Sequence, residues 1–205
     1  MGQIPESPAA GPACPKMTGM HTGRTLIDAS TTALVIVDLQ EKLLPAIQNA
    51  PTAVANVKNL LRLAQALGLK TLVTTQYRQG LGDTIPEIAG LLGATPLDKV
   101  CFGCMNDEAF RRELASALPA GGTVLLAGVE THICVMQTAL GALEAGYGVH
   151  VVSDATGSRA SANADLGIQR MRDAGAVVSS TEMAIYELLR DSRRPEFKQM
   201  LPYMK

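Results

Sequence analysis

Short apolar runs alternate with longer amphipathic segments along most of this chain, from residue 32 to residue 190. The runs have the length and the valine and isoleucine content of strands buried on both faces: ALVIVDLQ, TLVTTQ, KVCF, TVLLAGV, HVVSD and AVVSS. The segments between them repeat apolar residues at helical spacing, as in 54–68, which ends at Gly68. Such alternation predicts a three-layer α/β/α sandwich around a mainly parallel sheet, for which we expect the strand order 3-2-1-4-5-6.

The chain divides into two parts of different composition. Residues 1–24 are rich in Pro, Gly and Ala and show no periodicity, so we expect a flexible tail. Residues 25–205 are long enough to bury one well-formed core and are expected to form a single domain. The tail lacks the apolar core of a secretory signal, and the cytoplasm is therefore the expected location.

Composition and charge exclude several classes of partner. The formal net charge is -1 at pH 7, without a basic stripe that would bind nucleic acid or an anionic membrane surface. Aromatic residues make up 3% of the chain and Trp is absent, so base-stacking surfaces are not expected. The apolar runs are strand-sized, too short to cross a membrane. These features favour a protein that acts on a small molecule.

Four cysteines, at positions 14, 101, 104 and 134, are too few for a disulfide framework in a chain of 205 residues. Cys101 and Cys104 form a CxxC pair, which is half of a zinc site at most because no second pair or spaced histidines complete it. Two small loop residues are the simpler interpretation of this pair, and a thiol redox role is the alternative. Neither a metal nor another cofactor is expected.

Cys134 follows the run TVLLAG by a few residues, where a helix is expected to begin. Backbone N–H groups and the positive end of the helix dipole would stabilise a thiolate there, lowering the pKa of the thiol and forming an oxyanion hole. Cysteine is also among the most buried residues and often only packs. The position alone does not decide between a nucleophile and a core residue.

A nucleophilic thiol needs a base, and the histidines of this chain are poorly placed to supply it. One lies in the tail, His150 lies in an expected strand, and His132 precedes Cys134 by two residues, which turns their side chains to different faces of a helix. Asp38 and Asp154 each end an expected strand, at the edge of a parallel sheet where ligands bind. Each would equally suit a loop-capping role, and the residues alone do not separate the two aspartates.

A resemblance to a known family separates these alternatives. The stretches ALVIVDLQEKL, KVCF and GVETHICVMQTA resemble, in the expected order, the three catalytic signatures of the isochorismatase-like cysteine hydrolases, over essentially residues 32–190. TTQYRQGLGDTIPEI and the terminal RPEFKQML further resemble the isochorismatase domain-containing branch, close to the YcaC-like hydrolases. The resemblance implies a catalytic triad of Asp38, Lys99 and Cys134. In this triad Asp38 accepts the thiol proton, Cys134 attacks an amide or related carbon, and Lys99 stabilises charge on both.

The resemblance also implies how the reaction intermediates are stabilised. After the attack a leaving group departs, and water hydrolyses the resulting thioester. The backbone N–H groups of Glu130 and Cys134 are implied to hold the oxyanion. A cis peptide bond is implied between Val129 and Glu130.

Two departures from the family pattern reduce the range of expected substrates. Nicotinamidases of the family bind a metal through histidines after the second strand, whereas residues 71–98 contain no histidine. This difference argues against a metal and against nicotinamide as the substrate. Isochorismatases proper lack the nucleophilic cysteine, so Cys134 argues against isochorismate.

We therefore expect a metal-independent cysteine hydrolase that acts on a small C–N bonded, amide-like substrate. The alternative is a catalytically silent binding or interaction protein that retains the fold and the triad. Gln40, Tyr77 and Phe102 are candidate substrate-binding residues because each neighbours a signature or a strand end, and Gln76 belongs to the same group. Ordinary packing explains these side chains equally well. The resemblance also implies a homo-oligomer.

Overall fold

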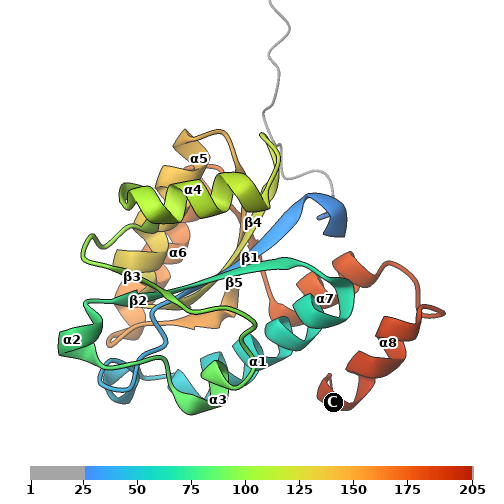
Figure 1. Ribbon diagram of the computed structural model, residues 1–205, viewed down its shortest axis with the longest axis horizontal. Coiled ribbons are helices and arrows are strands. Elements are labelled where there is room, and N and C mark those ends of the chain that lie inside the picture. The colour runs from blue at the N-terminus through green and yellow to red at the C-terminus, as the bar shows by residue number, and fades with distance from the viewer. Residues whose placement is uncertain (1–25, 205) are drawn as a thin grey trace, which may run out of the picture.

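The computed structural model describes residues 26–204, which fold around one six-stranded sheet (Figure 1). Every strand pair is parallel, and the strands lie in the order β3-β2-β1-β4-β5-β6, which confirms the predicted fold class and strand order. The predicted tail, residues 1–24, lies outside the described residues. The strands are Thr32–Val37 (β1), Lys70–Gln76 (β2), Leu97–Lys99 (β3), Thr123–Val129 (β4), Gly148–Gly157 (β5) and Val177–Ser179 (β6).

Helices cover both faces of the sheet and bury a separate apolar core against each (Figure 1). One face carries α1 (Ala50–Leu67), α3 (Pro86–Ala89), α7 (Thr181–Leu189) and α8 (Pro195–Met200), and the other carries α4 (Glu108–Ala117), α5 (Met136–Glu144) and α6 (Ser161–Asp173). Shorter elements are α2 (Arg78–Leu81), a π-helical turn at Thr131–Val135, and 3₁₀ turns at Ala29–Thr31, Leu44–Ala46, Cys104–Asn106 and Leu201–Tyr203. Among residues 26–204, no helix is long and apolar enough to cross a membrane.

The central strand β1 explains why its sequence has no polar alternation. Leu34 and Ile36 pack into the core on the α1 face, whereas Ala33, Val35 and Val37 pack into the core on the opposite face. All five side chains are fully buried. A strand covered on both faces needs apolar residues at every position, because successive side chains point to opposite faces.

Glycine is required at one close approach between the two central strands and at the end of α1. A Cβ atom at Gly128 of β4 would lie 2.3 Å from the carbonyl oxygen of Val37, so no larger residue fits beside β1. Gly68 ends α1 in the left-handed conformation (φ 67°), as the sequence predicted. Gly128 thus allows β1 and β4 to lie close together, and Gly68 allows the chain to turn from α1 into β2.

The strand expected in HVVSD is longer than predicted: β5 continues to Gly157, so Asp154 lies within the strand and does not end it. Two further elements differ from the sequence-based expectation. The helix expected directly after β4 begins as the π-helical turn Thr131–Val135, and regular α-helix starts only at Met136. The strand expected in KVCF ends at Lys99, so Val100 and Phe102 lie beyond the sheet. Both differences fall at the carboxyl ends of strands, where loop contacts rather than strand or helix periodicity determine the backbone.

Candidate active site

Three residues with left-handed backbone mark the carboxyl edge of the sheet. Asp38 (φ 58°), Tyr77 (φ 42°) and Glu130 (φ 58°) directly follow the last residues of β1, β2 and β4, which are neighbours in the sheet. The left-handed conformation costs a non-glycine residue about 1–2 kcal/mol, so surrounding contacts must maintain it. Such strain gathers at functional sites, and this is the edge at which open parallel sheets bind ligands.

A buried ion pair joins the predicted residues Asp38 and Lys99. Nζ of Lys99 lies 2.8 Å from Oδ2 of Asp38, and the side chains are 1% and 0% exposed. Lys99 also donates a hydrogen bond to Oε1 of Gln76 at 2.7 Å, and the hydroxyl of Thr74 donates to Oδ1 of Asp38 at 2.8 Å. Both charges are therefore paired and hydrogen-bonded, as charges removed from water must be.

The ammonium of Lys99 is a stable cation despite its burial. Burial is the largest single effect and lowers the pKa of Lys99, but the attraction and hydrogen bond to Asp38, together with the two nearby thiols, raise the pKa above its ordinary value. The interactions with Cys104 and Cys134 act in the same direction. A fixed positive charge beside two thiols is suited to stabilise a thiolate or an oxyanion.

Cys134 lies in the π-helical turn after β4, is 4% exposed, and interacts with both members of the ion pair. Burial raises the pKa of its thiol; the charge of Asp38 and a hydrogen bond with that carboxylate raise it further, whereas Lys99 lowers it. The prediction of a lowered pKa is therefore wrong for the resting protein, because desolvation and the carboxylate outweigh the attraction of Lys99. Cys134 rests as a protonated thiol next to a carboxylate that can accept its proton.

The turn after β4 also contains the predicted oxyanion donors, the N–H groups of Glu130 and Cys134. The carbonyl of Glu130 accepts hydrogen bonds from the N–H groups of Ile133 at 2.9 Å and Val135 at 3.3 Å, which fixes the backbone around Cys134. The prediction of a cis peptide bond between Val129 and Glu130 is wrong, because no peptide bond within residues 26–204 is cis. The left-handed backbone of Glu130 makes the sharp change of direction at this point.

The glutamines near the ion pair act on the backbone and on Lys99. Gln40 is fully buried; its Oε1 accepts from the N–H of Gln76 at 2.7 Å, and its Nε2 donates to the carbonyls of Gln76 and Gly82 at 3.0 and 2.8 Å. Gln40 thus joins the strand end of β2 to the loop at Gly82 through backbone hydrogen bonds, and its predicted role in substrate binding stays a prediction. Gln76 holds Lys99 and also donates to the carbonyl of Val100 at 2.8 Å.

Tyr77 and Phe102 are exposed apolar residues beside the buried triad. Tyr77 is 51% and Phe102 is 56% exposed, and Val100, which follows Lys99, is 78% exposed. The N–H of Tyr77 donates to the carbonyl of Lys99 at 2.8 Å, so these side chains leave the sheet from adjacent strand ends. They could contact an apolar part of a substrate, and this role stays a prediction.

Asp154 and Cys104, which were also candidates, have contacts that are typical of structural residues. Oδ1 of Asp154 accepts from the N–H and the hydroxyl of Thr181 at 2.7 and 2.9 Å, which caps the start of α7. Cys104 is fully buried, and burial raises the pKa of its thiol to about 12, which disfavours exchange with thiols in solution. The described cysteines are all free, and no group of three or more His, Cys, Asp or Glu residues in the described part could hold a metal.

One contact of the turn after β4 was not predicted from the sequence. Nε of Arg159 donates to Oε1 of Glu130 at 2.8 Å. This hydrogen bond connects the turn that contains Cys134 to the residues after β5. The sequence signal was a lone arginine at the end of VVSDATGSR, next to a strand end. Its partner could not be inferred, because Glu130 is 29 residues away along the chain.

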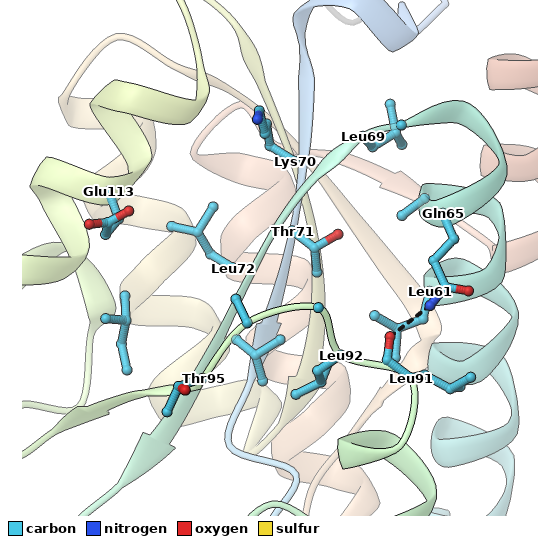
Figure 2. Close-up of a pocket in the computed structure, with 16 residues that line it drawn as sticks. Leu61, Gln65, Leu69, Lys70, Thr71, Leu72, Leu91, Leu92, Thr95 and Glu113 are labelled. Atoms are coloured by element: carbon cyan, nitrogen blue, oxygen red, sulfur yellow. Dashed lines mark hydrogen bonds between the residues drawn. The ribbon is translucent and has the colours of Figure 1, made fainter.

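A cavity of about 500 Å³ lies away from the triad, at the amino-terminal half of β2 (Figure 2). Leu61 and Gln65 of α1, residues 70–73 of β2, and Leu91 and Leu92 form much of its wall. No member of the triad lines it. The cavity therefore lies at the amino end of β2, whereas Asp38, Lys99 and Cys134 lie at the carboxyl edge of the sheet.

Comparison with known proteins shows the family of the chain. The Isochorismatase domain matches residues 32–183. The "Secreted isochorismatase effector Isc1" of Phytophthora sojae is 37% identical over 179 residues, covering 85% of each chain. Mouse "Isochorismatase domain-containing protein 2A" is 38% identical over 183 residues, covering 89% of this chain and 86% of the relative.

Solved structures with a similar fold support the same family placement. A structure named MAR1 ribonuclease from Caenorhabditis elegans has a TM-score of 0.81 at 34% identity, covering 88% of this chain and 92% of that one. The Escherichia coli YcaC gene product, described as an octameric hydrolase of unknown specificity, has a TM-score of 0.81 at 27% identity, with 87% and 90% coverage. Pseudomonas aeruginosa YcaC, solved with covalent acrylamide, has a TM-score of 0.81 at 28% identity, with 88% and 92% coverage. The chain belongs to the isochorismatase family and has the hydrolase fold of that family.

Proposed function

We propose that this protein is a metal-independent cysteine hydrolase that cleaves a small amide-like C–N bond through a thioester on Cys134. The observation that carries the proposal is the buried pair of Asp38 and Lys99, 2.8 Å apart, in contact with the thiol. Burying two charges is costly, and a hydrophobic pair of similar volume would serve packing as well. The arrangement is therefore better explained by proton transfer at Cys134 than by stability.

The resting protonation states define the first step. Asp38 takes the proton from the thiol as sulfur attacks the carbonyl carbon, so a full thiolate need not accumulate. The S–C bond forms while the carbonyl electrons move to oxygen, and the N–H groups of Glu130 and Cys134 hold the resulting oxyanion. Collapse breaks the C–N bond, and the proton held by Asp38 passes to the leaving amine.

The second half of the cycle uses the same groups in reverse. Asp38 accepts a proton from water as the hydroxide oxygen attacks the thioester carbon. The carboxylic acid leaves and the proton returns to the sulfur of Cys134. Lys99 stays positive throughout, because its pKa is raised, and it offsets the negative charge that moves between Asp38, sulfur and oxygen.

Burst kinetics with p-nitrophenyl acetate test the nucleophile directly. Acylation of Cys134 would release one equivalent of p-nitrophenolate per chain in a fast phase, followed by a slower steady state. Intact-mass analysis of the quenched protein would locate the acetyl group. A burst or turnover that survives in Cys134→Ala would refute the proposal. A wild-type protein that releases no p-nitrophenolate above the Cys134→Ala background, either in a burst or in the steady state, would also refute it and would favour a silent binding protein.

RNA is a competing substrate, because one similar structure, from C. elegans, is named a ribonuclease. The net charge of -1 and the 3% aromatic content of this chain offer little to bind a phosphate backbone. Incubation of the protein with a labelled single-stranded RNA, at low and physiological salt, separates the two activities. Cleavage abolished by Cys134→Ala would replace the amide proposal with RNA hydrolysis.

We propose further that the chain assembles with copies of itself in the cytoplasm. The E. coli YcaC gene product is described as octameric, and this chain matches it over 87% of its length. Size-exclusion chromatography with light scattering would reveal a monomer if the assembly proposal is wrong. Imaging of a tagged full chain would test the location, which the relative named as a secreted effector makes worth testing.

A further inference from the structure

We propose that Glu130 and Arg159 form a positioning pair that holds the nucleophile turn, residues 130–135, in the geometry that stabilises the oxyanion. The inference rests on the proposed function, because it assigns N–H groups of this turn to the negative charge of the intermediate. Neither side chain touches the reacting atoms in this scheme. Both act through the backbone of the turn.

The side chain of Glu130 is buried and has one strong partner. Its carboxylate is 5% exposed, and Oε1 accepts from Nε of Arg159 at 2.8 Å. Oε2 lies 3.5 Å from Nδ1 of His132, and no described residue makes a hydrogen bond to this oxygen. Loss of Arg159 would leave the buried carboxylate with only the longer contact to His132, and the side chain would tend to move toward water.

Movement of this side chain would be transmitted to the catalytic backbone. Glu130 carries the anchored carboxylate and a proposed oxyanion N–H on the same residue. Its φ of 58° is an unfavourable conformation that must be held from outside. Its carbonyl also accepts the N–H groups of Ile133 and Val135, on either side of Cys134. Rotation at Glu130 therefore redirects the donors around the nucleophile.

Other contacts fix the far side of the same turn and leave Arg159 as the anchor of Glu130. Nδ1 of His132 lies 3.0 Å from the hydroxyl of Ser158. Gly167 of α6 packs so closely that a Cβ atom there would lie 2.9 Å from Cα of His132. These contacts keep the turn folded when Arg159 is changed, so the expected defect is a misdirected N–H rather than an unfolded site.

Two reagents separate oxyanion stabilisation from the reactivity of the thiol. Acylation by p-nitrophenyl acetate passes through a tetrahedral oxyanion, whereas alkylation by iodoacetamide displaces iodide at a saturated carbon and forms none. We expect Arg159→Met to lower the acylation burst rate at least tenfold, since small misplacements of catalytic donors have effects of this size. The iodoacetamide rate at Cys134 should change less than threefold.

A second series distinguishes the pair from backbone strain. Glu130→Gln keeps the shape and a hydrogen bond to Arg159 but loses the charge, and should lie between wild type and Arg159→Met. Glu130→Gly removes the strain of a positive φ and also removes the anchor; it should be at least as impaired as Arg159→Met. The matched control is Arg194→Met, which breaks an Arg–Glu pair of 3.2 Å outside the site and should leave both rates unchanged.

The outcomes are distinct from those of the proposed function. Parallel losses of both rates in Arg159→Met would mean a damaged thiol site, and two unchanged rates would mean a surface ion pair; either result overturns the positioning role. Full acylation by Glu130→Gly would also overturn it, since only the backbone conformation would then matter. In each case the wild-type burst and its loss in Cys134→Ala still report independently on the proposed hydrolase.

Discussion

The two ends of β2 have the same strand geometry and opposite character. At the carboxyl end, Thr74 and Gln76 are buried polar residues that hold Asp38 and Lys99 through hydrogen bonds of 2.8 and 2.7 Å. At the amino end, residues 70–73 line the cavity of about 500 Å³ with mainly apolar walls from α1 and residues 91–95 (Figure 2). β3 pairs with residues 74–76 only, so the amino end has no neighbouring strand on that side.

The apolar cavity and the proposed active site therefore lie at different ends of β2. At the carboxyl end, the buried groups are paired charges and fixed hydrogen-bond donors. Such groups preorganise a reaction but leave little empty space. The amino end has room, but neither a cysteine nor a member of the triad lines the cavity. Catalysis should therefore be sensitive to single polar atoms at one end of β2 and insensitive to them at the other.

The largest expected effect is that of Lys99→Met. Loss of the ammonium leaves Asp38 buried without a counter-charge and removes the cation that offsets thiolate and oxyanion charge. We expect the p-nitrophenyl acetate burst rate to fall on the order of 10³-fold. Lys70→Met, at the amino end of β2, is the matched control and should retain the wild-type rate. Equal effects of the two substitutions would remove the distinction between the ends.

The second effect concerns the pH dependence of Cys134 alkylation. Burial raises the pKa of Cys134 and Asp38 raises it further, so the wild-type iodoacetamide rate should keep rising above the pKa of an ordinary thiol. Asp38→Asn removes the charge that opposes ionisation and should move the profile to lower pH, whereas its acylation activity should fall. A pKa lowered by one unit would raise the alkylation rate about tenfold at pH values below both pKa values. A shift to higher pH would contradict this electrostatic account.

A smaller effect is expected from removing one hydroxyl at each end of β2. Thr74→Val deletes the hydrogen bond to Oδ1 of Asp38 with little change of volume, and should lower the burst rate about tenfold. Thr71→Val makes the same chemical change at the wall of the cavity and should alter the rate less than twofold. Thermal unfolding of both variants would show whether the rate difference follows stability instead of position.

The smallest effect is expected inside the cavity itself. Leu92→Ser places a hydroxyl in the apolar wall and should leave both labelling rates within twofold of wild type. It should, however, weaken the binding of an apolar fluorescent dye if that dye occupies the cavity. A large loss of acylation would link the cavity to the catalytic edge and invalidate the comparison.

Much of the site was accessible from the sequence only through the family resemblance. Periodicity placed Asp38 and Asp154 at strand ends but did not separate them; the structure does, because Asp154 caps α7 and Asp38 binds Lys99. Lys99 had no signal in its local pattern, since lysines are ordinarily solvated. Gln40 was expected at the substrate because of its position in the sequence, yet its amide is used entirely by backbone groups.

The layers, the strand order and the helix end at Gly68 were predictable from the amino-acid sequence, because they follow from apolar periodicity, chirality and local backbone preferences. The raised pKa of Cys134, the trans bond before Glu130 and the contact with Arg159 became visible only in the folded chain. These features depend on desolvation and on charges brought together from distant segments. Local sequence patterns contain no information on either until the chain is folded.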